Sequence, residues 1–347
     1  MPSPKPITIV GGGLAGLTLG IGLRQQGIPA TVREAGHYPR HRVCGEFISG
    51  RGQDVLERLG LRESFAQTGS VLARTAAFYL GRSGSPVRLL PTPALCLSRF
   101  AMDALLADRF RQAGGELREN ARWREDDFGE GVVRANGRRR QPGADGCRWF
   151  GLKVHARNVS LAADLEMHGS QMGYVGFCRL ADGAVNVCGL FRQPANKTEG
   201  PQHWKDLLRG QPGTPLRERL AGAAFHESSF CSVAGFSLRP HRAAAQPECC
   251  IGDALTMIPP ATGNGMSMAF ESAEMAIDPL AAYSRGESSW GQARENVAAA
   301  CDRAFARRLA WARWLQWMMF APLLRGWPGS VVLHSELLWR TLFTRTR

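Results

Sequence analysis

Three glycines near the start of the chain have the spacing of a phosphate-binding turn. Gly11, Gly13 and Gly16 form a GxGxxG pattern between a β-branched run at 7–10 and an apolar segment at 14–26. In such a turn the first glycine permits the bend, the second lets the backbone approach a pyrophosphate, and the third allows close helix packing. The free amides at the helix N-terminus then face the phosphates, so the pattern predicts a nucleotide site.

An acidic residue follows where a bound ribose requires one. Glu34 ends a second predicted strand, 29–34, and lies the expected distance of about 20 residues beyond the glycines. A carboxylate there accepts hydrogen bonds from ribose hydroxyls. The succession of strand, turn, helix, strand and acid predicts a dinucleotide-binding βαβ unit; the alternative is a glycine-rich turn with an incidental acid.

A second segment, 251–266, has features that suit a flavin. It contains Asp253, then the glycine-rich stretch PPATGNGM, which leads into a predicted helix at 265–282. A carboxylate at Asp253 can accept hydrogen bonds from ribityl hydroxyls. Free amides at Gly263 to Met266 and the helix dipole would stabilise negative charge on a reduced flavin. The two segments together predict FAD.

The stretches GGGLAG, REAG and IGDALTMIPPATGNGMSMAFESA together resemble the flavoprotein superfamily that contains aromatic-ring hydroxylases, geranylgeranyl reductases and flavin-dependent halogenases. The segment YPRHRVCGE at 38–46 resembles the stretch that follows the ribose-binding acid in the reductase and halogenase branches. The resemblance implies that Arg42 neutralises an FAD phosphate or lies beside the ring, and that Cys44, Gly45 and Glu46 approach the isoalloxazine. The alternative is a basic surface loop.

Two further positions are assigned by the same resemblance. Arg99 follows Ser98, a helix N-cap candidate, where the family's arginine contacts the cofactor; a solvated charge is the alternative. Asn136 follows a predicted strand at 132–134, where relatives carry an acid, whereas Asp145-Gly146 has no preceding strand and is interpreted as a loop. The residues predicted to bind FAD are Gly11, Gly13, Ala15, Gly16, Glu34, Ala35, Arg42, Cys44, Gly45, Arg99, Asn136, Gly252, Asp253, Pro260, Gly263, Asn264, Gly265 and Met266.

Side chains that could act on a substrate are few. Cys44, Glu46 and His155 are the candidates, and His155 lies in a predicted sheet strand, where a lone histidine is more often structural. Nine scattered cysteines have no metal-ligand spacing, so no metal is expected, and reduced thiols favour a cytoplasmic location.

The elements that must position these residues follow from the hydrophobic pattern. Helices are predicted at 98–113, 265–282 and 302–320, and strands at 151–167, at 173–191 with a turn at 181–183, and at 248–251. A surface connection with a short helix is expected at 194–215. This order predicts an α/β fold, with a Rossmann-like FAD-binding domain of the hydroxylase type, an inserted antiparallel-sheet substrate domain and a helical C-terminus. The predicted segments are 1–70, 98–148 and 236–300 for FAD, 71–97 and 149–235 for substrate, and 301–347 for the C-terminus.

Charge and the C-terminal region suggest partners. The net charge is +13, which favours nucleotide phosphates, anionic lipids or an acidic carrier, or reflects an arginine-rich surface. The apolar stretch 309–324 contains Arg313 and Gln316 and falls short of a membrane span. Tryptophans and arginines there predict core packing, a lid over an apolar substrate, or peripheral membrane contact. No recognition fold for nucleic acid and no secretory signal is expected.

The resemblance implies a reaction class. With one GxGxxG, NADPH or NADH is expected to visit the flavin transiently, which predicts a monooxygenase that hydroxylates an apolar or aromatic secondary metabolite, free or carrier-bound. A geranylgeranyl-reductase-like alkene reductase is the main alternative, because of the CGE segment and the apolar C-terminus. Halogenation is a minor alternative, because no Trp-x-Trp-x-Ile-Pro segment occurs and Lys153 lies in a predicted strand. A non-catalytic flavin sensor is another.

Overall fold

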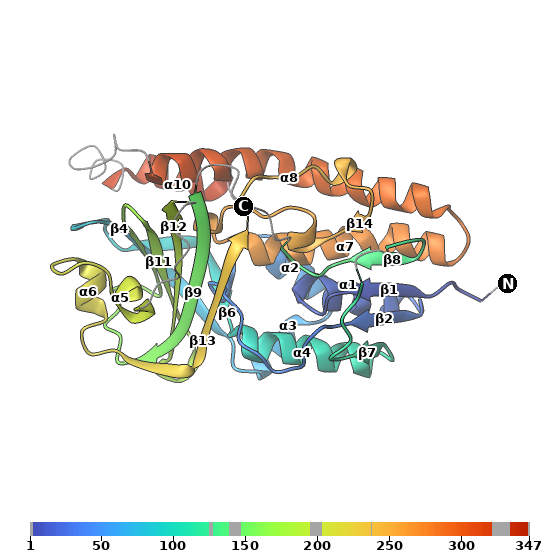
Figure 1. Cartoon of the computed structure of the whole chain (residues 1–347), viewed down its shortest axis with the longest axis horizontal. Coiled ribbons are helices and arrows are strands. Elements are labelled where there is room, and N and C mark those ends of the chain that lie inside the picture. Colours follow the sequence, from blue (N-terminus) through green and yellow to red (C-terminus); the bar gives the residue numbers. More distant parts are fainter. Residues whose placement is uncertain are drawn as a thin grey trace.

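Two β-sheets of different size lie side by side, and the long helix α8 (Trp290–Phe320) passes along both (Figure 1). The computed structural model describes residues 3–124, 128–138, 147–194, 203–236, 238–320 and 334–345. Asp145-Gly146 and Trp327 lie outside these residues. Among the described helices, none combines the length and the apolar character that a membrane span requires.

The smaller sheet is parallel, with strand order β14-β8-β1-β2-β7. Its strands are β1 (Ile7–Val10), β2 (Ala30–Arg33), β7 (Glu116–Arg118), β8 (Val132–Arg134) and β14 (Cys249–Cys250). Ile7, Ile9 and Val32 are fully buried, as expected for a parallel sheet covered on both faces. The predicted βαβ unit is therefore confirmed, and its strand ends meet at one edge.

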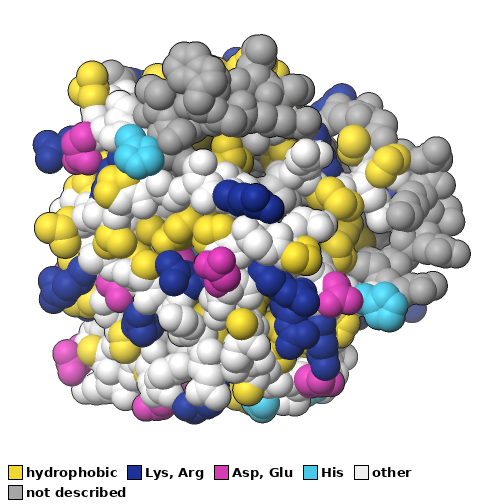
Figure 2. Space-filling view, turned by 90° about the vertical axis from the view of Figure 1, so that its left-hand side faces the viewer, with side chains coloured by type: hydrophobic (Ala, Val, Ile, Leu, Met, Phe, Trp, Pro, Cys, Tyr) yellow, Lys and Arg dark blue, Asp and Glu magenta, His cyan; other side chains and the backbone are white. Residues whose placement is uncertain are grey.

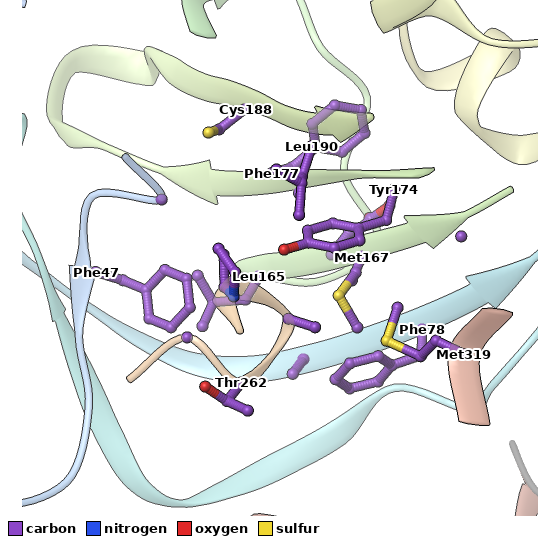
Figure 3. A pocket seen from close by; sticks show the side chains of 18 of the residues that line it. Phe47, Phe78, Leu165, Met167, Tyr174, Phe177, Cys188, Leu190, Thr262 and Met319 are labelled. Atoms are coloured by element: carbon purple, nitrogen blue, oxygen red, sulfur yellow. The ribbon is translucent and has the colours of Figure 1, made fainter. Parts of the chain in front are cut away.

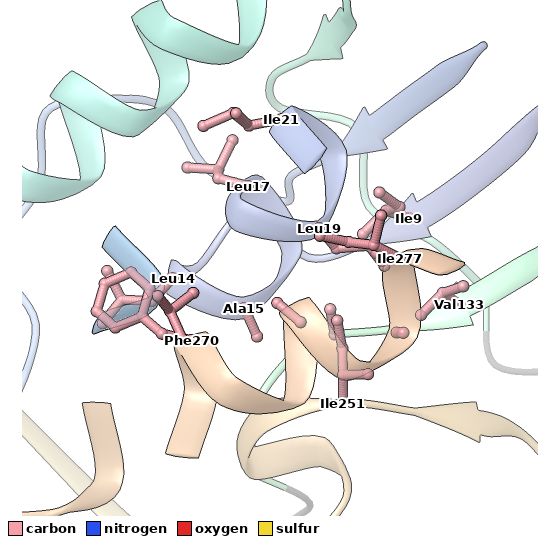
Figure 4. Close-up of a cluster of buried hydrophobic side chains, with 14 of the residues drawn as sticks. Ile9, Leu14, Ala15, Leu17, Leu19, Ile21, Val133, Ile251, Phe270 and Ile277 are labelled. Carbon is pink, nitrogen blue, oxygen red and sulfur yellow. The ribbon is translucent and has the colours of Figure 1, made fainter. Parts of the chain in front are cut away.

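Helices α1 (Leu14–Gln25), α4 (Arg99–Gln112) and α7 (Gly265–Ser284) pack around this sheet (Figure 4). Leu17, Ile21 and Phe270 are buried in their common core. A Cβ at Gly22 would collide with Ile277, so α1 and α7 approach closely because this position has no side chain. Ser98 caps α4 as predicted, since its Oγ accepts from the amide of Ala101 at 3.2 Å.

The larger sheet has the order β13-β9-β12-β11-β10-β4-β6-β3. Its strands are β3 (Phe47–Ile48), β4 (Val71–Leu80), β6 (Arg88–Cys96), β9 (Cys147–Arg157), β10 (Leu165–Gly169), β11 (Gly173–Arg179), β12 (Val185–Pro194) and β13 (Ala224–Phe236), and β5 (Ser83–Gly84) pairs with β4. All pairs are antiparallel except β10 with β4. The hairpin of β11 and β12, with a short turn helix at Ala181–Gly183, confirms the pattern predicted at 173–191.

One predicted strand is wrong. Residues 151–167 do not form a single strand, because β9 ends at Arg157 and Asn158 adopts a left-handed φ of 58°. The chain leaves the sheet there and returns as β10, with β12 and β11 between the two strands. Apolar residues alternate on both sides of the break, but the phase shifts by one residue, from Leu152, Val154 and Ala156 to Val159, Leu161, Ala163 and Leu165, so alternation without its phase suggested one strand.

Shorter helices complete the fold. They are α2 (Gly52–Arg58), α3 (Arg62–Gln67), α5 (Trp204–Arg209), α6 (Pro215–Arg219) and α10 (Glu336–Arg345). Leu208 of α5 and Leu216 of α6 pack against Leu152 and Val154 on one face of the larger sheet. Figure 2 shows that the surface at this end of the molecule carries apolar patches among Lys and Arg side chains, with acidic groups between them.

Segment boundaries differ from the predicted ones at two points. β3 belongs to the larger sheet, although its residues fall within the segment 1–70 assigned to FAD binding. Helix α8 begins at Trp290, so the predicted boundary at 301 lies inside one continuous helix. The ion pair between Arg308 and Glu271, with both side chains buried, fastens α8 to α7. The wider domain division stays a prediction.

Candidate functional site

The glycine turn has the geometry that phosphate binding needs. Gly11 has a φ of 111°, and a Cβ there would collide with the backbone of Ala135. A Cβ on Gly16 would collide with the carbonyl of Gly11, whereas a Cβ on Gly13 would meet no atom within 4 Å. Helix α1 begins at Leu14 without a side-chain cap. Gly11 and Gly16 therefore allow the tight turn, and Gly13 leaves the backbone open toward a ligand.

Glu34 lies beside this turn as a buried anion. Its carboxylate accepts from the amides of Gly12 and Gly36, each at 2.9 Å, and from Arg40 at 2.6 Å. Burial opposes ionisation, but the Gly36 amide and the charges of Arg42 and Arg40 outweigh it, so the pKa of Glu34 lies below its usual value. The ionised carboxylate can accept further hydrogen bonds, and a ribose hydroxyl that bound there would share it with Arg40.

The segment at 251–266, which is predicted to bind the flavin, packs directly on the start of α1. A Cβ on Gly252 would approach that of Ala15 to 2.9 Å, so the two segments touch where both side chains are minimal. Burial raises the pKa of Asp253, although Arg138 and Arg99 lower it in part. Helix α7 begins at Gly265 without a side-chain cap from Asn264, so its N-terminal dipole faces the site.

Two arginines converge on a residue that the sequence reading missed. Asp103, fully buried on α4, accepts from Nε of Arg42 and Nε of Arg99, each at 2.7 Å. The four-residue spacing of Arg99 and Asp103 on a helix could have indicated this pair. The cofactor contacts of Arg42 and Arg99 stay predictions, and the structure adds that Asp103 orients both guanidinium groups.

Asn136 lies next to the phosphate turn. Its Cα would be 2.5 Å from a Cβ on Gly11, and its side chain is exposed and accepts from Arg134 at 3.3 Å. Ala35 is exposed beside Glu34. Both positions adjoin the predicted dinucleotide site, and their contacts with the cofactor stay predictions.

The CGE segment joins the two sheets through Glu46. This residue is fully buried with a left-handed φ of 61°. Its carboxylate accepts from the amide of Arg99 at 2.9 Å and pairs with Nε2 of His155 at 2.6 Å and Nζ of Lys153 at 3.1 Å. Burial opposes ionisation, but the His155 hydrogen bond and the Lys153 charge outweigh it and lower the pKa of Glu46. Glu46, His155 and Lys153 therefore form one cluster of polar side chains, in which the Glu46 carboxylate and the Lys153 ammonium are fully buried.

Cys44 faces a different environment from Glu46. Its backbone carbonyl accepts from Nδ2 of Asn186 at 2.8 Å, which fixes the segment against β12. Burial raises the pKa of the Cys44 thiol, and the nearby Arg99 charge offsets this only in part. The thiol therefore stays protonated near neutral pH, which disfavours a thiolate nucleophile. All nine cysteines are free in the structure.

A cavity of about 320 Å³ opens between the larger sheet and the two segments, around Cys44 and Gly263, that are predicted to face a flavin (Figure 3). Cys44 and Gly45 line it on one side, and Pro260 and Gly263 line it on another. Most of the remaining wall is apolar or sulfur-containing, and it includes Phe47, Phe78, Leu165, Met167, Tyr174, Phe177, Cys188, Leu190, Leu315, Met318, Met319, Trp339 and Phe343. Within the described part of the chain, the wall does not include Glu46, Lys153 or His155.

Two charged groups in the cavity wall, Arg88 and Glu166, have ion-pair partners, and Arg138 also lines the cavity. Arg88 pairs with Glu336 at 3.1 Å, and Glu166 pairs with Arg219 at 3.1 Å and with His168 at 2.9 Å. The cavity therefore favours an uncharged, lipophilic ligand. In the residues that the structure describes, no group of His, Cys, Asp and Glu side chains could hold a metal ion.

The C-terminal helices form part of this wall. Trp339 and Phe343 of α10 and Leu315 and Met319 of α8 line the cavity, which fits the predicted lid over an apolar substrate. Trp317 on α8 is 65% exposed. Tyr174 and Phe177 also line the cavity, and no local signal in the sequence marks them, because sheet register decides where they point.

Comparisons with known proteins agree with this geometry. Residues 5–157 match the family described as FAD binding domain. The rifampicin monooxygenase of Streptomyces venezuelae is 25% identical over 302 residues, which cover 77% of this chain and 62% of that protein, so the chain spans less than two thirds of this relative.

Solved structures share the fold at low sequence identity. A flavin-dependent brominase has a TM-score of 0.76 at 16% identity, covering 98% of this chain and 92% of its own. The myxobacterial chondrochloren halogenase has a TM-score of 0.74 at 19% identity, and the match covers 100% of this chain and 91% of the halogenase. A Pseudomonas aeruginosa protein in complex with 2-aminobenzoylacetate has a TM-score of 0.66 at 16% identity, and the match covers 99% of this chain and 100% of that protein. These likenesses confirm the predicted fold.

Proposed function

We propose that this chain, a flavin-dependent enzyme of the superfamily that contains aromatic-ring hydroxylases and halogenases, is an NAD(P)H-dependent monooxygenase that hydroxylates a small apolar or aromatic compound. The observation that carries the proposal is the position of the cavity. Its apolar wall contains Cys44, Gly45, Pro260 and Gly263, which belong to the two segments predicted to face the isoalloxazine. A substrate in the cavity would thus lie against the flavin, away from bulk water.

The residues present fit FAD. The open backbone at Gly13 and the uncapped start of α1 suit the pyrophosphate, Glu34 suits the ribose, and Asp253 suits the ribityl chain. FAD, when bound, supplies hydride acceptance from NAD(P)H and activation of oxygen. The N-terminal dipole of α7 stabilises negative charge beside Gly265.

The chain's own contribution to the reaction is binding, orientation and exclusion of water. Glu46 is engaged by Lys153, His155 and a backbone amide, so it serves structure rather than proton transfer to a cavity ligand. The aromatic and thioether wall buries a hydrophobic substrate and strengthens electrostatic interactions inside it. Proximity and orientation against the flavin then supply much of the rate enhancement.

Halogenation is the second candidate, and one observation favours it. Lys153 lies two residues from the cavity-lining Gly151 on β9, so the two positions share a face of the sheet. Its ammonium, however, is fully buried and pairs with Glu46 at 3.1 Å and lies 3.1 Å from Nδ1 of His41. That engagement favours a structural role for Lys153 and hydroxylation over halogenation. Alkene reduction remains the third candidate because the CGE segment reaches the cavity.

One experiment separates these reactions. The FAD-loaded protein is reduced with NADPH without oxygen, then mixed with oxygen, chloride, bromide and a panel of lipophilic aromatic and polyene compounds, and the products are weighed by mass spectrometry. Hydroxylation adds one oxygen atom, alkene reduction adds two hydrogen atoms without oxygen, and halogenation adds chlorine or bromine. Substrate-stimulated NADPH oxidation with an oxygenated product supports the proposal. Only reduced or halogenated products, or no substrate effect, contradict it.

A further inference from the structure

The hydroxyl group of Tyr174 is a polar atom enclosed in an apolar wall. Tyr174 lies on β11, is 7% exposed and lines the cavity. Its hydroxyl oxygen is buried and has no hydrogen-bond partner in the described residues. Figure 3 shows the ring extending into the cavity, with the oxygen directed toward its interior near Leu165 and Met167.

A buried hydroxyl without a partner is costly, and native proteins usually satisfy such groups. The labelled neighbours of Tyr174 in the cavity are Leu165, Met167, Phe177 and Leu190, which offer little to hold a water molecule in place. A ligand atom that enters the cavity is therefore the partner that the geometry best provides. The hydroxyl would then be satisfied only in the complex.

Two other polar groups at the wall, Tyr79 and Glu166, already have hydrogen-bond partners. The hydroxyl of Tyr79 accepts from Nη2 of Arg219 at 3.0 Å, and the carboxylate of Glu166 is held by Arg219 and His168. Burial raises the pKa of Tyr174 well above its usual value, so the group remains a phenol that can donate. Tyr174 thus differs from Tyr79 in that its hydroxyl neither accepts nor donates a hydrogen bond among the described residues.

We propose that Tyr174 determines specificity by donating a hydrogen bond to a neutral carbonyl oxygen of an otherwise lipophilic aromatic substrate. A ketone, ester or quinone oxygen is a suitable acceptor, because the labelled neighbours of Tyr174 are apolar and a carboxylate among them would be an unpaired charge. This inference rests on the proposed function, since it names the substrate class of the same cavity.

The position of Tyr174 gives the hydrogen bond a consequence for orientation. Tyr174 packs in one cluster with Leu190 and Met257, and Ala261 and Met319 lie against that cluster. Met257 and Ala261 belong to the loop that leads to α7, which is predicted to face the flavin. A carbonyl held by Tyr174 therefore fixes which end of the substrate lies next to the flavin.

The test compares two ligands of nearly equal shape on the FAD-loaded, oxidised protein. The probes are 2-acetylnaphthalene and 2-isopropenylnaphthalene, in which a CH₂ group replaces the carbonyl oxygen, and binding is measured by titration calorimetry. The native protein should bind the ketone roughly 3- to 10-fold more tightly than the alkene, as one hydrogen bond with a neutral acceptor predicts. Tyr174→Phe should abolish this preference, and Tyr79→Phe, which removes an engaged hydroxyl, should keep it.

A spectroscopic readout accompanies the affinities. The carbonyl stretching band of bound 2-acetylnaphthalene should lie at lower frequency in the native protein and in Tyr79→Phe than in Tyr174→Phe. Equal affinity of the native protein for the two probes, or no change of either readout in Tyr174→Phe, overturns the inference. The assay needs no turnover, so a ketone preference lost in Tyr174→Phe would stand even if the oxygenation experiment failed.

Discussion

Nε2 of His155 lies 2.6 Å from a carboxylate oxygen of Glu46, and the pair joins the larger sheet to the segment that follows the dinucleotide site. Lys153, fully buried, adds a cation to the same carboxylate, and the amide of Arg99 at the start of α4 adds a third hydrogen bond. One side chain therefore holds a sheet strand, a helix N-terminus and the CGE segment together. The left-handed φ of Glu46 shows how strongly these contacts constrain the backbone.

Replacement of Glu46 tests this structural role. Glu46→Gln should lower the free energy of unfolding by about 3 kcal/mol, because it leaves the buried Lys153 ammonium without its counter-ion. Denaturant unfolding measures the change. The matched control is Glu274→Gln, which removes a partly exposed pair with Arg58 and should cost at most about 1 kcal/mol. Equal effects of the two substitutions would contradict the role of the buried cluster.

Acid should weaken the fold through His41. Burial and the Lys153 charge lower the pKa of His41 from 6.5 to about 4. Between these values the unfolded chain binds more protons than the folded chain, so stability falls as the pH decreases from 6.5 toward 4. His41→Gln should flatten the decline of unfolding free energy over this range, and His37→Gln, at an exposed position, should leave it unchanged. Identical pH profiles for native protein and His41→Gln would refute this assignment.

Two glycines of the phosphate turn should respond differently to alanine. Gly13→Ala should change the unfolding free energy of the apoprotein by less than about 1 kcal/mol, because the new Cβ meets nothing, yet it should weaken FAD binding roughly tenfold or more. Gly16→Ala should destabilise the apoprotein itself, since its Cβ collides with the Gly11 carbonyl. Thermal unfolding and flavin fluorescence titration separate the effects. An unchanged FAD affinity in Gly13→Ala would contradict the predicted approach of the pyrophosphate.

Replacement of Asp253 should raise the stability of the apoprotein and weaken its binding of FAD. Burial raises the pKa of Asp253, so the folded apoprotein holds its proton more tightly than the unfolded chain, and ionisation at neutral pH opposes folding. Asp253→Asn should therefore raise the melting temperature of the apoprotein at pH 7 while lowering its affinity for FAD. Asp278→Asn, at an exposed site, is the control for both measurements. A variant that loses stability and retains full FAD affinity would exclude the cofactor role.

The sequence predicted the parts of the fold that depend on local pattern. The βαβ unit, the hairpin of β11 and β12 and helix α7 each carry their own glycines, turn residues and apolar period within a short stretch. The break between β9 and β10 escaped prediction because the return strand pairs in parallel with β4, about 90 residues earlier, a partner that no local pattern reveals.

Some residues of the candidate site likewise follow from a local motif, whereas others depend on contacts between distant segments. Predicted cofactor positions such as Gly13 and Glu34 follow from a motif whose spacing is set by one turn and one helix. The grouping of Glu46, Lys153 and His155 depends on which strand of the sheet lies under the CGE segment. The wall position of Tyr174 depends on strand register, and Asp103 becomes significant only when Arg42 is brought to it from another loop.

The sulfur atoms of the cavity wall have a consequence for how long the enzyme lasts. Met167, Met318 and Met319 present thioethers to the space where the proposed reaction activates oxygen. Turnover without substrate would release peroxide there, and a thioether that takes one oxygen atom from peroxide becomes a polar sulfoxide, leaving water. An occupied cavity keeps the oxidant away from these side chains. Bound substrate should thus protect these methionines, and turnover without substrate should inactivate the protein by oxidation within its own binding site.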